Sequence, residues 1–487
     1  MDTVDLIKDA LSQPSAEIAK AFTQPSIATS GLNYYDLEAP AKTLYPVITP
    51  LRNVTPRVSG RGGIQANWRA ITGINVNKIA VGLGEGNRGG VIGTDTLDYS
   101  ASYRGIGLDD YVTFEAGYAA EGFDDAKARA VQGLLRSLMI GEELLILGGN
   151  SGVALGTTPT PTLSAAGSGS SLTATATSVI CVALTLEGYY RASVSGGIQA
   201  SVTRTNADAS TDTYGGGSAQ KSAAASVTPS AGNYIAASVA PVNGAVGYAW
   251  FWGASGSEVL GAVTTINSVS IGAAAAGTQT AASLPSADNS RNSMVFDGLL
   301  YQCFTSGSNS YVHSMATGTP GTGTALTPNN VGGVEEIDTA LQSFWDNYRL
   351  SPDEIWVSSQ EQKSITNAIL GGASTSAQRF NVSVDQNALI GGFAVKEYLN
   401  PFSMSGSTAI PIKLHPNMPK GTIMFRTERL PYPLSNVQNV TQIRTRQEYY
   451  QLEWPLKSRK YEYGVYADEV LQNYFPPAFG VITNIGA

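Results

Sequence analysis

The sequence predicts an α+β protein that is interrupted by an all-β sandwich, and three observations lead to this prediction. Residues 122–148 repeat apolar side chains with the period of a helix, whereas residues 57–105 alternate apolar and polar side chains as paired strands do. Residues 158–285 carry almost no charge. An ordinary mixed composition returns on both sides of that segment, so we expect one α+β body with a sandwich inserted into it.

The composition narrows the class of protein. At 487 residues the chain is long enough for two to four domains with a proper core. Its charged fraction is 14%, against about 25% in ordinary proteins, and its net charge of -8 disfavours a broad basic face that grips nucleic acid. No apolar run reaches the ~18 residues of a membrane span, and the N-terminus carries acids where a signal peptide is basic. We therefore expect a soluble chain that is not exported.

Residues 1–57 predict an N-terminal arm. Apolar side chains near its start recur at roughly helical spacing and indicate one or two short amphipathic helices. The stretch that follows is punctuated by prolines, each of which denies the backbone a helix, so we expect it to be extended and to gain order by lying across another surface. The apolar positions are Val4, Ile7, Leu11, Ile18 and Phe22, and the prolines are Pro40, Pro46, Pro50 and Pro56.

Residues 58–108 predict a long two-stranded hairpin with a glycine-rich tip. Residues 84–89 of the tip fit the dinucleotide-binding glycine pattern, but strand-like sequence follows, so the helix that such a cofactor site needs is missing. An isolated hairpin is marginally stable in water, and one this long must lean on a neighbour. Its alternating side chains are Ile64, Ala66, Trp68, Leu97, Tyr99 and Tyr103.

Residues 122–148 give the strongest helix signal in the chain. Asp124 and Asp125 favour the N-terminal turn, and Gly148 and Gly149 close the helix. At about 1.5 Å per residue, such a helix is about 40 Å long. Its apolar face is formed by Val131, Leu134, Leu135, Leu138 and Leu145.

Residues 158–285 predict a small antiparallel β-sandwich. Short alternating runs recur in this segment, and no convincing helix interrupts them. The segment PVNGAVGYAWFWG resembles one strand of fibronectin type III and immunoglobulin-like domains. Because its composition is self-contained, we expect residues ~155–288 to fold when expressed alone. Its charged residues are Glu187, Arg191, Arg204, Asp208, Asp212, Lys221 and Glu258, and its alternating runs are Tyr190/Ala192/Val194, Ala200/Val202, Tyr234 to Val239, Tyr248/Trp250/Trp252 and Val269/Ile271.

Residues 286–487 return to a mixed α+β pattern. We expect helices over residues 334–345 and 360–370, with a buried strand in SPDEIWVSS between them, and late strands over residues 442–448 and 460–466. The basic and aromatic residues of these late strands could suggest stacking on single-stranded nucleic acid. Strand alternation, with Tyr461, Tyr463 and Val465 facing inward, explains them more simply.

No residue pattern indicates catalysis, so we expect no catalytic, metal or cofactor site and no enzyme. The serine-elbow, zinc-helix and phosphate-loop motifs are missing. Cys181 and Cys303 lie too far apart for a metal spacing and predict buried free thiols. We expect His313 and His415 to be surface or satisfied core residues, and acidic doublets to serve helix ends and solvent faces, since neighbours on a helix point about 100° apart. The doublets are Asp109/Asp110, Asp124/Asp125, Glu142/Glu143 and Glu335/Glu336.

Taken in order, these elements resemble the major capsid protein of tailed bacteriophages, the Hong Kong 97-like fold. The resemblance covers residues 1 to ~157 and ~286 to 487. Its carriers are LEAPAKTLYPVITPLRNVTPR, GFDDAKARAVQGLLRSLMIGEELLILGG, GGVEEIDTALQSFWDNYRLSPDEIWVSSQEQ and YGVYADEVLQNYFPPAFGVITNI. The implied parts are an N-terminal arm (1–57), an extended loop (58–108), a peripheral domain with the spine helix (109–157), an inserted immunoglobulin-like sandwich (158–285), and an axial domain with the rest of the peripheral domain (286–487).

The resemblance implies a function of assembly. The chain would form hexamers and pentamers of an icosahedral virion shell in the host cytoplasm, enclosing the genome through non-specific contact, with the sandwich as a surface decoration. Portal, cement and scaffolding proteins are implied partners; the chain lacks the long N-terminal coiled segment that serves some relatives as an internal scaffold. The hairpin and its root supply the subunit-contact candidates Trp68, Lys78, Glu85, Arg88 and Arg104.

Two other functions remain open from the sequence. An encapsulin-type compartment has the same implied fold but houses cargo enzymes, and a long neutral sandwich is unusual there. An adhesin or surface-layer protein built on the sandwich would need export, for which no signal is visible.

Overall fold

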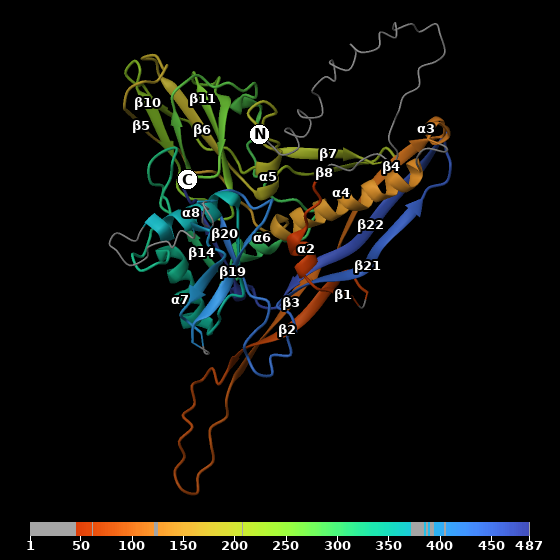
Figure 1. The fold of residues 1–487 in the computed structure, drawn as a ribbon, viewed down its shortest axis with the longest axis vertical. Coiled ribbons are helices and arrows are strands. Elements are labelled where there is room, and N and C mark those ends of the chain that lie inside the picture. Colours follow the sequence, from red (N-terminus) through yellow and green to blue (C-terminus); the bar gives the residue numbers. More distant parts are fainter. Residues whose placement is uncertain are drawn as a thin grey trace. The chain divides into compact units, whose positions relative to one another are not determined.

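The computed structural model describes residues 45–60, 62–120, 125–206, 208–371, 384–385, 388–389, 394–403 and 406–486 (Figure 1). The predicted α+β class is confirmed. Two compact units divide the chain: one comprises Gly107–Ile140 and Tyr450–Tyr466 with the described residues up to Thr49, and the other comprises Pro50–Ile106, Gly141–Tyr449 and Ala467–Ala487. The helices predicted near the start of the arm lie outside the described residues. None of the helices in the described part is long and apolar enough to cross a membrane.

The proline-rich stretch contains a short helix, α2 (Pro50–Val54), that the sequence analysis did not predict. Pro50 is its first residue, and a proline is accepted there because the N–H it lacks has no intrahelical partner at that position. The expectation that every proline in this stretch denies a helix was therefore wrong at Pro50. The chain then forms β1 (Arg57–Ser59), which pairs in parallel with β21 (Thr441–Glu453), Arg57 opposite Ile443.

The predicted hairpin is confirmed as the antiparallel pair β2 (Gln65–Ile74) and β3 (Thr94–Ser102). The register runs from Gln65 opposite Ser102 to Ile74 opposite Thr94, with one irregularity before Gly73. In the described part of the chain these two strands form a sheet of their own, and no third strand pairs with either edge.

The predicted long helix is confirmed as α4 (Ala126–Gly148). The Asp125 side chain accepts the N–H groups of Lys127 and Ala128 at its first turn, as expected for an acidic helix start. The apolar face is also confirmed, since Leu134 and Leu138 are buried. The helix ends where a Cβ on Gly148 would lie 2.1 Å from the Leu186 side chain, so the close approach of that leucine requires glycine.

A four-stranded sheet has the order β1-β21-β22-β4, with β22 at Lys460–Asn473 and β4 at Arg104–Thr113. Tyr463 and Val465 of β22 are buried and Tyr461 is half-buried, which agrees with the inward face predicted for this strand. Short α3 (Phe114–Ala119) follows β4, and its N-cap Thr113 accepts the N–H of Ala116.

The body after the sandwich is built on a six-stranded sheet of order β14-β23-β20-β15-β19-β18. Its predicted helices are confirmed as α7 and α8, and the SPDEIWVSS strand as β15. Strands β16 and β17 lie outside this sheet and, among the described residues, pair only with each other. The bounds are α6 Leu299–Phe304, β14 Tyr311–Ser314, α7 Glu335–Tyr348, β15 Glu354–Val357, α8 Ser359–Gly371, β16 Val384–Asp385, β17 Ala388–Leu389, β18 Glu397–Asn400, β19 Thr408–Leu414, β20 Ile423–Arg426 and β23 Phe479–Thr483, with 3-10 turns at Ala281–Ser283 and Pro476–Ala478.

A buried ion pair joins two adjacent strands of this sheet, with Glu354 of β15 and Arg426 of β20 at 2.7 Å. Lys413 of β19 also contacts the Glu354 carboxylate, and the Trp356 indole donates to it at 2.8 Å. Burial by itself would raise the pKa of Glu354, but the Lys413 hydrogen bond and the charge of Arg426 outweigh it, so the pKa lies below its ordinary value.

The segment 162–271 forms two facing sheets, β13-β10-β5 and β12-β11-β6-β9. Both sheets contribute to one apolar cluster, to which β6 gives Cys181, β11 gives Trp250, and β10 gives Ile235. A sandwich is therefore present; where an autonomous domain begins and ends stays a prediction, as does any immunoglobulin likeness. The bounds are β5 Thr162–Ala166, β6 Thr177–Leu184, β9 Ala225–Val227, β10 Tyr234–Ser238, β11 Gly247–Gly253, β12 Val259–Thr264 and β13 Ser268–Ile271, beside a separate ribbon of β7 Ser201–Thr205 and β8 Thr211–Gly215.

One helix does interrupt the sandwich, contrary to the prediction. The run at Tyr190 and Ala192 that indicated a strand belongs instead to α5 (Leu186–Arg191) and its end. Thr185 caps this helix by accepting the N–H of Gly188, and Glu187 pairs with Arg191 one turn later at 2.8 Å. These local contacts outweigh an alternation that only three residues supported.

We predict that Gly148→Ala destabilises the protein by about 1–3 kcal/mol, although alanine is the better helix former, because its Cβ would overlap the Leu186 side chain. Gly141→Ala on the same helix is the control, since a Cβ there meets nothing within 4 Å, and it should gain up to about 1 kcal/mol. Urea unfolding followed by circular dichroism measures both changes. Equal effects of the two substitutions would contradict the close approach at Gly148.

We predict that Glu354→Gln costs about 3–5 kcal/mol at pH 7, because it leaves the buried Arg426 without its main counter-charge. A carboxyl with a lowered folded pKa stabilises the protein above its unfolded pKa of about 4.3, and this contribution is lost as the pH falls through the folded pKa. The difference between wild type and variant should therefore shrink below pH ~4. Denaturant unfolding at several pH values tests this, with Glu428→Gln, a half-exposed partner of Arg426, as a control that changes little.

Candidate subunit-contact surface and its buried anchor

The hairpin and its connecting loop expose most of their apolar side chains. Val81 is 94% exposed, Val91 87% and Ile74 72%. Isolated exposed aliphatic side chains are common, but this many on one two-stranded element form an uncovered apolar surface. The further exposed members are Ile64, Ile71, Val76, Leu83, Ile92 and Leu97.

Asparagine side chains organise the base of the connecting loop. The Asn75 amide donates to the carbonyl of Ile79 at 3.0 Å and its oxygen accepts the N–H of the same residue at 2.9 Å. Asn77 donates to the carbonyl of Val91 at 3.1 Å, which links the two sides of the loop. The glycine pattern at residues 84–89 lies exposed in this loop and is followed by strand β3, so the predicted hairpin tip is confirmed there.

The structure divides the five predicted contact residues between two places. Lys78, Glu85 and Arg88 are exposed on the connecting loop, whereas Trp68 and Arg104 are half-buried at the hairpin root. Trp68 stacks on Tyr99 with ring centroids 5.8 Å apart. Their role in subunit contact stays a prediction.

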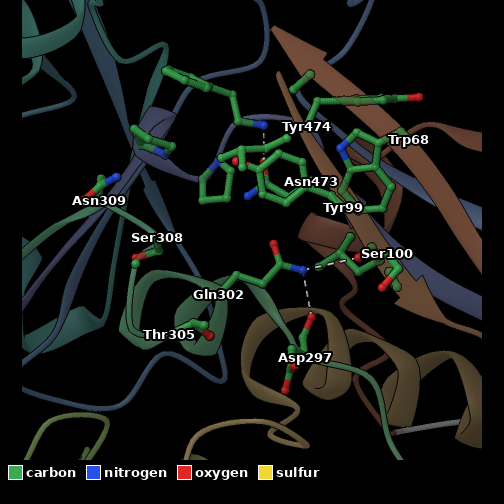
Figure 2. Close-up of a pocket in the computed structure, with 18 of the residues that line it drawn as sticks. Trp68, Tyr99, Ser100, Asp297, Gln302, Thr305, Ser308, Asn309, Asn473 and Tyr474 are labelled. Atoms are coloured by element: carbon green, nitrogen blue, oxygen red, sulfur yellow. Dashed lines mark hydrogen bonds between the residues drawn. The ribbon is translucent and has the colours of Figure 1, made fainter. Parts of the chain in front are cut away.

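A cavity of about 780 Å³ lies between the hairpin root and the body (Figure 2). Aromatic rings and prolines form much of its wall. Two buried polar atoms at its lining, the indole nitrogen of Trp68 and the side-chain oxygen of Gln302, have no hydrogen-bond partner among the described residues. A group that brings one acceptor and one donor, as a peptide group does, would satisfy both. The aromatic and proline walls are Trp68, Tyr99, Tyr348, Tyr432, Tyr474, Phe475, Pro476 and Pro477.

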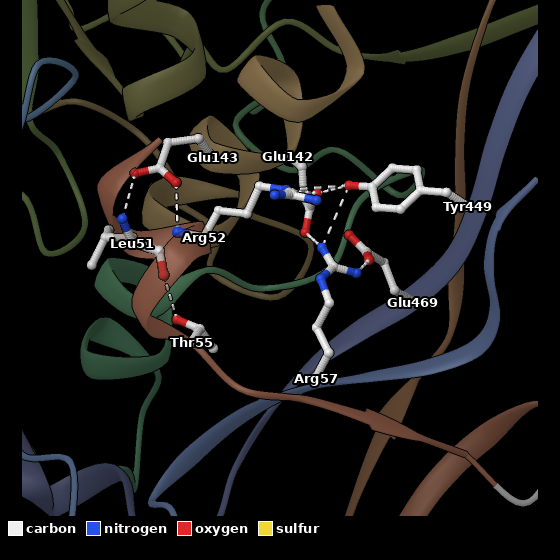
Figure 3. Close-up of polar contacts among 8 residues, drawn as sticks. All are labelled: Leu51, Arg52, Thr55, Arg57, Glu142, Glu143, Tyr449 and Glu469. Carbon is white, nitrogen blue, oxygen red and sulfur yellow. Dashed lines mark hydrogen bonds and ion pairs between the residues drawn. The ribbon is translucent and has the colours of Figure 1, made fainter. Parts of the chain in front are cut away.

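The doublet Glu142/Glu143 of α4 was predicted to face solvent or a helix end, and this was wrong, because both side chains are fully buried. Figure 3 shows their polar contacts. The other doublets in the described residues fit the expectation better, since Asp125 starts α4 and Glu335 and Glu336 start α7. The position of Glu142 and Glu143 inside the apolar run LMIGEELLILG was the signal that could have revealed their burial.

Glu143 holds the start of α2. Its two carboxylate oxygens accept the backbone N–H groups of Leu51 at 2.8 Å and Arg52 at 2.7 Å, where a helix N-terminus favours negative charge. His415, the residue after β19, contacts the same carboxylate at 2.6 Å through Nε2. Since Nδ1 of this ring accepts the N–H of Asn417, His415 is the neutral Nε2–H tautomer and donates to Glu143. As predicted, His415 is a buried histidine whose two ring nitrogens both have hydrogen-bond partners, whereas His313 is exposed at the surface.

Glu142 gathers a second set of partners about 100° further round the helix. It pairs with Arg52 at 2.8 Å and with Arg57, and the hydroxyl of Tyr449 donates to it. Both guanidinium groups also lie over the Tyr449 ring, 5.4 and 5.1 Å from its centre. Desolvation lowers the pKa of Arg52 below its ordinary value, against the raising effect of nearby carboxylates.

Glu469 of β22 completes the cluster. It pairs with Arg57 at 3.0 Å through one oxygen, while its other oxygen is buried with no partner among the described residues. Three carboxylates then face two arginines and a neutral histidine. Burial raises the pKa of Glu469 despite the opposing charge of Arg57, which is the direction that relieves this excess of negative charge.

The cluster therefore fixes α2 and β1 to the helix α4 and to strand β22. Every acidic and basic member of the cluster has a partner within it, and only one oxygen of Glu469 is left without one among the described residues. Cys181 and Cys303 are buried free thiols, as predicted. No group of three metal-binding side chains gathers anywhere in the part of the chain that the structure describes.

Comparison with known proteins gives no family model and no curated relative that matches. Solved structures do match over most of the chain. The capsid of Myoviridae phage XM1 is 9% identical with a TM-score of 0.40, covering 93% of this chain and 97% of that one. The capsid of cyanophage A-1(L) is 11% identical with a TM-score of 0.39, covering 93% and 96%. The SrpI encapsulin of Synechococcus elongatus PCC 7942 is 8% identical with a TM-score of 0.36, covering 92% and 93%. Similarity at this level does not by itself assign a function.

We predict that Glu142→Gln costs about 1.5–3 kcal/mol, because it removes the buried counter-charge that the partly buried Arg52 and Arg57 share. Glu469→Gln should cost clearly less, since one oxygen of Glu469 has no partner. Its raised pKa means that the ionised form opposes folding once the pH exceeds the unfolded pKa of about 4.3, so this variant should gain on wild type as the pH rises.

Denaturant unfolding of both variants at pH 5 and pH 8 measures these effects. Equal losses for Glu142→Gln and Glu469→Gln at both pH values would contradict the division of charge within the cluster.

Proposed function

We propose that this chain is a major capsid protein of the Hong Kong 97-like type, which self-assembles into an icosahedral shell around the genome of a tailed phage. One observation carries the proposal: the β2–β3 hairpin leaves its apolar side chains exposed and both its strand edges unpaired in the described part of the chain. Such an element is marginal in isolation and needs another surface to cover it.

A second copy of the chain is the partner that suits this hairpin. Each copy offers an uncovered hairpin and, at the hairpin root, a cavity with an unpaired donor and an unpaired acceptor. Contacts between two different patches of identical chains run head to tail, and such contacts close into rings when the rotation allows it. Rings of five and six copies would be the pentamers and hexamers of the shell, with obligate interfaces of about 2,000 Å² or more.

The buried cluster around Glu142 and Glu143 is a second feature that supports this function. A subunit that is held by its neighbours must pass force from the hairpin and the arm into its body. Glu142 and Glu143 join α2 and β1, which precede the hairpin, to the long helix through contacts to two fully buried carboxylates, whose surroundings of low dielectric constant strengthen each contact.

Charge and composition fit a container. With a net charge of -8, the shell would not bind the packed, negatively charged genome tightly. Contact with the genome would therefore be non-specific. The neutral sandwich would project outward as a decoration, the shell would form in the host cytoplasm, and scaffolding, portal and cement proteins would be further partners. The chain itself would have no enzymatic role.

Electron microscopy of the purified full-length chain, alone and with lysate of infected cells, tests the proposal. Closed shells or capsomers are expected, and shells recovered from lysate should contain nuclease-protected DNA. Shells filled with one protein cargo and no DNA would favour the encapsulin alternative. A particle that stays monomeric under all conditions, or the mature chain found only at a cell surface, would overturn assembly as the function.

We predict that the double variant Val81→Asp/Val91→Asp abolishes assembly while the subunit stays folded, because it places two charges where a neighbouring copy should cover apolar surface. Each of these aliphatic side chains is worth up to about 1.5–3 kcal/mol when covered. Sedimentation velocity measures assembly and circular dichroism measures folding. Thr203→Asp, on the exposed β7–β8 ribbon, is the control and should assemble normally; assembly of the double variant would contradict the role of the hairpin.

A further inference from the structure

The β-sandwich contacts the body through three turns that lie at the same end of its strands. The end of β6 at Leu184 pairs with the start of β11 at Gly247, and the end of β12 at Thr264 pairs with the next residue of β11. On the facing sheet, the end of β10 pairs with the start of β13. The chain segments that follow or precede these ends are α5, residues 239–246 and residues 265–267, and all three meet the body.

The first turn inserts Leu186 into the body. This side chain is fully buried and belongs to the same apolar cluster as Leu147 of α4 and Tyr301 of α6. The Tyr301 hydroxyl accepts the backbone N–H of Leu186 at 2.9 Å and donates to the carbonyl of Gly244 at 3.0 Å. One body side chain therefore satisfies two buried backbone groups of the sandwich, and neither would find water if the hydroxyl were removed.

The second turn adds Val246 and Asn243. Val246 is buried in the apolar cluster of the body, and the Asn243 side chain donates to the carbonyl of Phe304 at the end of α6 at 2.9 Å. Gly244 has a φ of +86°, and a Cβ there would lie within 3.1 Å of Val153 and 3.2 Å of Leu155. The turn is thus fitted closely against the chain that leaves α4.

The third turn forms a reciprocal amide contact. The backbone N–H of Asn267 donates to the Asn484 side-chain oxygen at 2.8 Å, and the Asn484 side-chain nitrogen donates back to Asn267 at 3.0 Å and to the carbonyl of Met315 at 2.7 Å. Asn267 also donates to Thr317 at 3.0 Å. Asn267 is fully buried and Asn484 nearly so, which ties the sandwich to the residue that follows β23, an interior strand of the body sheet.

We propose that the β-sandwich is an integral part of the body's folding unit and not a decoration on flexible linkers. The contacts of α5, residues 239–246 and residues 265–267 with the body hold it in one orientation. The proposal does not depend on whether the chain builds a shell. Without the sandwich the body would lose Leu186 and Val246 from its core and leave the Tyr301 hydroxyl and the Asn484 amide with fewer partners. Residues ~155–288 expressed alone would expose the same groups, so this segment should be less stable alone than within the chain.

Native-state hydrogen exchange of the full-length wild-type chain tests this without any substitution. Amides of β6 in the sandwich and of β20 in the body should open with the same free energy and respond equally to denaturant, since they belong to one cooperative unit. Protection of β6 that persists after β20 has lost its own, or the reverse, would overturn the proposal.

Two variants that remove hydrogen bonds between the sandwich and the body supply a second test. Tyr301→Phe removes only the hydroxyl, and Asn484→Gly removes the amide while keeping a residue that tolerates its φ of +62°. Each should lower the single melting temperature by about 2–6 °C and speed exchange of β6 and β20 amides alike, by about 5- to 100-fold. Tyr348→Phe is the matched control, since that hydroxyl makes one exposed bond to Asn309, and it should leave both unchanged. Faster exchange confined to the sandwich or to the body would contradict the proposal.

Discussion

The buried contacts of Glu142 and Glu143 are the interaction on which the architecture depends. Two adjacent carboxylates on one helix point about 100° apart, so they reach different elements: one caps α2 and meets His415, and the other binds Arg52 and Arg57. Because a buried charge that loses its partner costs several kcal/mol, the members of the cluster are stable only together. The chain that precedes the hairpin is thereby fixed to α4.

The hairpin next along the chain has the opposite character. Its register runs from Gln65 to Ile74 with one irregularity, yet most of its apolar side chains face solvent and its outer edges are unpaired within the described residues. A strongly anchored root beside an uncovered apolar surface is the combination that the proposed assembly would use, since covering that surface would provide the driving force and the anchor would carry the resulting contact into the body.

The sandwich shows how an inserted segment can become part of its host. Its own core, around Trp250 and Cys181, is made from both of its sheets. Its three turns nevertheless place Leu186 in the core of the body and exchange amide hydrogen bonds with Asn484. The low charge of residues 158–285 identified a separate composition, but composition reports on the surface of a segment and is silent about how its ends are buried.

Periodicity in the sequence determined the local elements: the helix of α4, the β2–β3 hairpin, the strands around Trp250 and the helices α7 and α8 all follow from spacing that neighbouring residues share. Where only a few residues carried the pattern, as at Tyr190 or Pro50, a cap or a tolerated first-turn proline changed the outcome. The candidate site was less predictable. Trp68 and Arg104 were named for their place on the hairpin, but the cavity beside them and the burial of Glu142 and Glu143 arise from Gln302, Arg57, His415 and Glu469, whose distance along the chain leaves no periodic trace. Only the tertiary structure decides which charges are buried together, because that depends on long-range contacts.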